Sequence, residues 1–199
     1  MAQEHELGIC FGCQPAQLLA DIAFPQHSIC MDHPPLPLAR IVANINVDGL
    51  ATRGIPGDVV AIGGELSDLG ELLRRAARSL GLEVARPDAV ATGHEAYARS
   101  DQAAFAEAGV PAVLINEGFT RAGTRRDEAL RQTLEWLATV YHSPADDLSQ
   151  PLDYEAARRH LGAVLALLLT VGDSLEEPRW RPGVPYAYQR LVSLADASR

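Results

Sequence analysis

IVANINV, residues 41–47, is the stretch of the chain that most clearly predicts the fold. Its β-branched residues predict a strand, and the Asp-Gly pair that follows is typical of the turn that ends one. Two further strands are expected at DVVAI (residues 58–62) and PAVLIN (residues 111–116). Apolar residues with helical spacing occur between the second and third of these strands and again after the third. The alternation of strands and helices predicts an α/β fold.

The expected helices have recognisable start and stop signals. Ser67 is an expected N-cap of the first, and Gly81 stands where a left-handed residue ends a helix. Asp153 is the expected N-cap of a long helix that ends at Gly172. Two more helices are expected over residues 101–109 and 125–141, the second with Leu130, Leu134 and Leu137 in register. The chain shows no internal repeat and no linker, so we expect one domain.

Length and composition restrict the classes of protein that are possible. The 199 residues are 47% hydrophobic and 22% charged, which is typical of a globular domain and excludes a disordered or fibrous chain. The net charge of −9, without any basic block, argues against nucleic acid and anionic membranes as partners. The longest apolar stretch, residues 161–171, is shorter than the ~20 residues that span a bilayer, and it predicts a buried core helix.

Neither the N-terminal residues nor the cysteines identify the cellular compartment of the protein. Two acidic residues and no basic one precede the first apolar run, so we expect no secretory signal. The pairs Cys10/Cys13 and Cys30/His33 have spacings compatible with a Cys3His structural zinc site. Pro34 and Pro35 follow at once and no hairpin pattern surrounds the first pair. We therefore expect these four side chains not to converge.

Three positions have residue types suited to chemistry. Asp48 follows the first strand, and ligands of α/β sheets bind at the carboxyl ends of strands. His142, in YHSPADD, suits a metal ligand whose second ring nitrogen Asp146 or Asp147 would orient. Taken alone, the local pattern favours an ordinary turn residue at Asp48 and a solvent-exposed loop residue at His142. The pair Ser100-Asp101 reads as a helix cap.

Four segments together resemble a known family. They are HPPLPLARIVANINVDGL, RSDQAAFAEAGVPAVLI, YHSPADD and RWRPGVPY. In this order they resemble the zinc-dependent exopeptidases of the bacterial leucyl aminopeptidase and aminopeptidase Y type, over about residues 31–186. The resemblance implies a three-layer fold of the phosphorylase/hydrolase-like kind, with a mixed, mostly parallel sheet between helices and two zinc ions at the strand ends. It also implies a peptide substrate.

The resemblance further implies roles for individual residues. Asp48 would be a ligand of one zinc ion and His142 of the other. The family also uses an upstream His, an Asp that bridges both metals, and a Glu-Glu pair of general base and ligand. That pair would align with Gln3-Glu4 or with His5-Glu6, so Glu6 or Glu4 is the third candidate ligand and the general base is replaced.

These matches and gaps predict one incomplete peptidase domain over residues 1–199. Residues 1–30 are atypical, residues 31–186 are family-like, and residues 187–199 are a tail. We expect an incomplete sheet, a truncated or altered gene, and no useful hydrolysis of aminoacyl substrates. Two alternatives stay open, namely a non-catalytic interaction protein on the same fold, as in transferrin receptor, and a small module held by a Cys3His zinc site.

Overall fold

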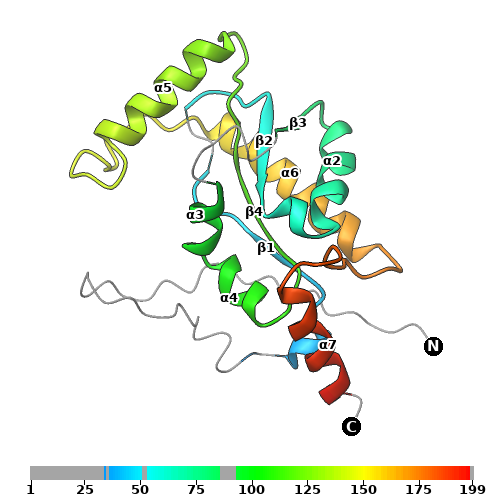
Figure 1. Cartoon of the computed structure of the whole chain (residues 1–199). Coiled ribbons are helices and arrows are strands. Elements are labelled where there is room, and N and C mark those ends of the chain that lie inside the picture. The colour runs from blue at the N-terminus through cyan, green and yellow to red at the C-terminus, as the bar shows by residue number, and fades with distance from the viewer. Residues whose placement is uncertain (1–33, 35, 51–52, 86–92, 198–199) are drawn as a thin grey trace.

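The sheet has four strands in the order β1-β4-β2-β3 (Figure 1). The computed structural model describes residues 34, 36–50, 53–85 and 93–197. Strand β1 (Asn44–Asn46) pairs in parallel with β4 (Ala112–Glu117), and β2 (Asp58–Ile62) pairs in parallel with β3 (Glu83–Ala85). The central pair, β2 and β4, is antiparallel. This mixed, mostly parallel and open sheet confirms the predicted fold class.

Apolar side chains cover both faces of the sheet. Along β2, Val59 and Ala61 pack into one hydrophobic cluster, whereas Val60 and Ile62 pack into the other. Successive side chains of a strand point to opposite faces, so a strand that is buried on both faces is apolar throughout. The sheet is therefore the middle of three layers, as predicted.

Helices from distant parts of the chain form the outer layers. On one face lie α2 (Leu69–Arg78) and the long α6 (Tyr154–Gly172). On the other face lie α3 (Gly93–Ala98), α4 (Gln102–Glu107) and α7 (Tyr186–Ala197). Two short 3-10 turns, Leu38–Arg40 and Gly64–Leu66, precede β1 and α2.

The termini of most predicted elements agree with the structure. Asp153 caps α6, because its carboxylate accepts from the backbone N–H of Ala156 at 3.0 Å. Gly81 has φ +63°, the left-handed conformation expected at the end of a helix. Strand β1 is shorter than the predicted 41–47, since it has a described pairing partner on one side only. Residues 187–199, predicted as a tail, lie largely in α7 (Tyr186–Ala197), and before this helix the indole of Trp180 donates to the carbonyl of Gly109.

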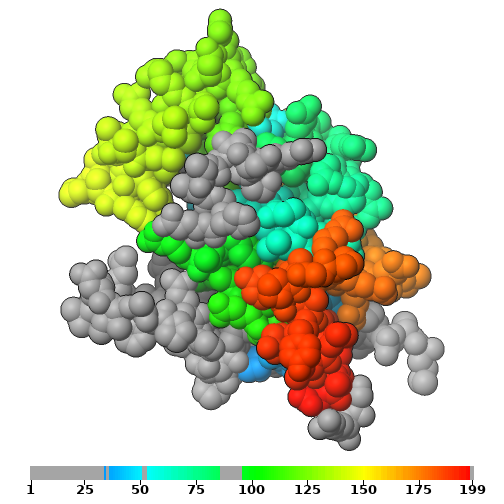
Figure 2. Space-filling model, viewed as in Figure 1, coloured from blue at the N-terminus to red at the C-terminus, as the bar shows by residue number. Residues whose placement is uncertain are grey.

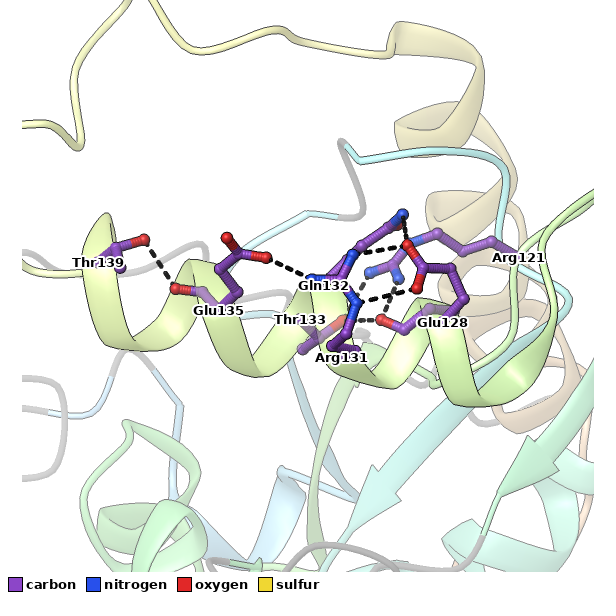
Figure 3. Close-up of polar contacts among 8 residues, drawn as sticks. Arg121, Glu128, Arg131, Gln132, Thr133, Glu135 and Thr139 are labelled. Carbon is purple, nitrogen blue, oxygen red and sulfur yellow. Dashed lines mark hydrogen bonds and ion pairs between the residues drawn. The ribbon is translucent and has the colours of Figure 1, made fainter.

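Helix α5 (Arg126–Thr139) lies at one end of the molecule, apart from the three layers (Figures 1 and 2). It is held mainly near its first turns, where the guanidinium of Arg121 donates to the carbonyl of Ala129 and to the hydroxyl of Thr133 (Figure 3). The expected apolar face exists but stays largely exposed, at Leu130, Leu134 and Leu137. None of the described helices is both long and apolar enough to cross a membrane.

Part of the predicted core helix is also exposed. The inner face of α6 is buried at Ala163, Val164, Leu167 and Val171, as expected. Its outer residues Leu161, Leu165 and Leu169 are 42–56% exposed. The apolar run 161–171 is therefore only partly covered by the described residues.

Candidate functional site

Asp48 lies two residues beyond β1, at the carboxyl end of that strand. Its side chain is exposed, and Gly49 after it adopts φ +97°, a left-handed conformation that favours glycine. Because β1 and β4 run in parallel, their carboxyl ends meet at the same edge of the sheet. Asp48 thus presents a carboxylate at the edge where α/β folds bind ligands.

Ser100 and Asp101 approach Asp48 from the turn before α4. The hydroxyl of Ser100 is 3.2 Å from Oδ2 of Asp48 and 3.1 Å from the carbonyl oxygen of Ala96, and it can donate to either. Burial raises the pKa of Asp101, and the negative charge of Asp48 raises it further. The predicted cap hydrogen bond is wrong, because no side chain caps the N-terminus of α4, although Asp101 stands at its N-cap position. Ser100 contacts a carboxylate 52 positions away instead.

His142 follows α5 in a left-handed conformation that non-glycine residues rarely adopt, with φ +56°. Its ring stacks on the ring of Tyr141, with 3.8 Å between the centroids. Its backbone N–H donates to Oδ2 of Asp146 at 3.4 Å. Asp146 therefore supports the His142 backbone, whereas the expected contact with a ring nitrogen stays a prediction.

Tyr141 lies between the two predicted ligands in one respect: the charge of Asp48 affects its pKa, and its ring stacks on that of His142. Burial raises the pKa of the Tyr141 hydroxyl, and the charge of Asp48 raises it further, followed by that of Asp146. Asp48 thus lies within electrostatic reach of the residue whose ring stacks on His142. That Asp48 and His142 belong to one metal site stays a prediction.

The described residues alone do not fit a complete zinc site. A catalytic zinc ion takes three protein ligands and a water molecule. In the parts of the chain that the structure describes, no three His, Cys, Asp or Glu side chains are grouped closely enough to hold a metal ion. Six of the predicted residues lie outside the described residues: Glu4, Glu6, Cys10, Cys13, Cys30 and His33.

Sequence reasoning missed a cluster next to this edge. Arg53, five residues after Asp48, forms an ion pair with Glu117 at the end of β4 and lies 3.9 Å from the ring centroid of Trp136. Burial and the neighbouring Arg121 lower the pKa of Arg53 to about 10, although the charge of Asp146 acts in the opposite direction. No local pattern predicts this cluster, because its members come from three separate segments.

Comparison with models of known families gives a match over most of the chain. The model of Peptidase family M28, whose members depend on zinc, matches residues 22–168. The matched span includes Asp48, Ser100, Asp101 and His142. Searches of curated proteins and of solved structures each found no significant match.

Proposed function

Because the chain belongs to peptidase family M28, we propose that it is the C-terminal portion of a dizinc aminopeptidase of the leucyl aminopeptidase or aminopeptidase Y type. Asp48 is the proposed ligand of one zinc ion, His142 of the other, and Glu6 an additional ligand. The reaction of the complete site is release of the N-terminal residue of a peptide. Zinc supplies a water molecule of lowered pKa and polarises the scissile carbonyl when it is bound.

One observation carries this proposal. Asp48 follows β1 at the carboxyl edge of the sheet, where α/β folds bind ligands, and His142 follows α5 in a segment far away in the sequence. The family match spans both segments. A carboxylate and an imidazole are among the ligand types that bind zinc in catalytic sites.

We further propose that the printed chain does not hydrolyse aminoacyl substrates at a useful rate. Asp48 and His142 supply one ligand each, and no described group of three completes either set. In addition, residues 3–6 have Gln3 or His5 where the family places its general base. General acid–base help is worth about 10²–10⁴ in rate.

The test measures zinc content and turnover of the same preparation. The 199-residue chain is dialysed with zinc, and zinc per chain is determined by mass spectrometry. Hydrolysis of leucine p-nitroanilide is then followed with and without added zinc. We expect less than one zinc ion per chain. We also expect no hydrolysis above background, so that a chelator has no effect on the measured rate.

Variants separate the ligand assignment from the predicted inactivity. Asp48→Asn and His142→Ala are expected to reduce the residual zinc binding, whereas Asp173→Asn, at an exposed carboxylate after α6, leaves it unchanged. Equal binding by all four proteins would contradict the ligand assignment. Two tightly bound zinc ions with chelator-sensitive turnover would show instead that the site is complete.

A further inference from the structure

A cavity of about 370 Å³ lies between α5 and the loop that leads to α6. Helix α5 contributes Gln132, Glu135, Trp136 and Thr139 to its wall. Gln132, Glu135 and Thr139 lie along one side of that helix (Figure 3). The volume is within the usual range for small-molecule and side-chain pockets.

The charges that line the cavity favour a cation. Three carboxylates line it, from Glu135, Asp146 and Asp147, against a single cationic side chain, Arg53. The charge of Arg53 is compensated by its ion pair with Glu117, and that of Glu135 by its ion pair with Arg131 at 2.9 Å, so the excess negative charge lies on Asp146 and Asp147. A cationic group that enters the cavity therefore meets an excess of negative charge.

Apolar surface adjoins these carboxylates. The ring of Trp136 and the side chains of Val140, Pro151 and Leu152 line the same cavity. Lysine and arginine place their methylene stems on apolar surface and keep the charged end near polar groups. A cavity with apolar walls and carboxylates fits such a side chain better than a purely apolar or an anionic one.

The cavity is also connected to the candidate site. The ring of Trp136 lies 5.2 Å from that of Tyr141, which stacks on His142. Val140, a lining residue, directly precedes this pair in the chain. A peptide bound at the sheet edge would therefore have one of its side chains within reach of the cavity.

We propose that this cavity is a binding site for the basic side chain, lysine or arginine, of a peptide. The carboxylate of Asp147, with that of Asp146 beside it, attracts the charged end, and Trp136 and Val140 contact the stem. Binding by itself requires neither zinc nor turnover. Only the statement that the basic residue belongs to a peptide substrate rests on the proposed function.

The test observes Trp136 directly. The chain has two tryptophans, so labelling with 5-fluorotryptophan gives two ¹⁹F signals, which the variant Trp136→Phe assigns. Nα-acetylarginine amide is titrated into the labelled chain without metal. Nα-acetylcitrulline amide, which has nearly the same shape but no charge, serves as the matched probe. Trp180, buried under α4 and α7, is the internal control.

We expect the Trp136 signal to shift saturably with a dissociation constant of about 1–10 mM, as suits a ligand of this size. The citrulline probe is expected to bind at least about tenfold more weakly, because it lacks the charge. The variant Asp147→Asn weakens arginine binding by about three- to fivefold. The matched control Asp127→Asn, on α5 but outside the cavity wall and paired with Arg125, leaves it within about twofold.

Three results would overturn the inference: no saturable shift of Trp136 up to about 50 mM, equal binding of both probes, or equal effects of Asp147→Asn and Asp127→Asn. Because no zinc is present, saturable binding by the arginine probe supports the cavity even if the zinc assignment fails. Conversely, loss of zinc in the Asp48 and His142 variants supports the proposed function even if the cavity binds nothing.

Discussion

Two leucines of α6 provide a sharp test of which face of this helix the fold buries. Leu167 is fully buried in the cluster that α6 forms with α2 and the sheet, whereas Leu165 is 55% exposed. Both lie inside the same helix, so replacement by alanine changes the helix propensity equally. The variants Leu167→Ala and Leu165→Ala therefore differ in packing alone.

The expected costs differ several-fold. Removal of a buried leucine side chain loses its transfer free energy and leaves a cavity, which costs about 2–5 kcal/mol. For Leu167, enclosed on all sides, we expect about 3 kcal/mol. Leu165 loses only about half of the ~2 kcal/mol that full burial of such a side chain provides, so we expect about 1 kcal/mol. A difference of about 2 kcal/mol is a factor of roughly 30 in the unfolding equilibrium.

Urea unfolding followed by circular dichroism at the helix band measures both free energies. The slopes of the two variants should equal that of the unchanged chain, which shows that the same surface unfolds. Equal destabilisation by the two variants would refute the reasoning, because it would mean that Leu165 is covered as fully as Leu167 in solution. A larger effect at Leu165 would reverse the assignment of the buried face.

Two further predictions concern a helix cap and a buried histidine. Asp153→Ala should lower the free energy of unfolding by about 1 kcal/mol and Asp153→Asn by less, measured by the same urea titration, since only the alanine removes the acceptor for the N–H of Ala156. His160 is fully buried on α6, with Nε2 3.2 Å from the carbonyl oxygen of Ile115, and burial lowers its pKa below the ordinary 6.5. The unfolded chain therefore takes up this proton first, so stability should fall as the pH drops below about 6.5 and through the lower folded-state pKa. Titrations between pH 7.5 and 5 should show a weaker pH dependence in His160→Gln; an unchanged dependence would exclude His160 as its source.

Local patterns predicted β1, β2 and β4 and most of the predicted helix termini, but not β3. The run 58–62 is apolar after its first residue and ends before Gly63, and the structure has β2 over the same residues. Asp153 caps α6 as expected, because a capping carboxylate and the backbone N–H that donates to it are three residues apart. The order of strands was not predictable in this way. The antiparallel contact of β2 with β4 depends on packing between segments about fifty residues apart.

In the candidate site, too, residues within local motifs were predicted and contacts between distant segments were not. Asp48 and His142 were recognised because each stands in a short motif, and both positions lie within the family match. The role of Ser100 was missed, since its position before a helix is typical of a cap, whereas its hydroxyl faces Asp48. The Arg53–Glu117–Trp136 cluster was missed for a similar reason, because its residues are unremarkable within their own segments.

The sequence by itself determined the α/β class, the positions of β2, β4 and α6, and Asp48 as the carboxylate that follows β1. Backbone propensity, capping and hydrophobic period depend on neighbours within a few positions, so the sequence displays them directly. Only the tertiary structure decided that Leu167 is buried while Leu165 is exposed, and that Ser100 faces Asp48. These outcomes depend on which distant segment covers each surface, and that coverage follows from packing of the whole chain rather than from any local pattern.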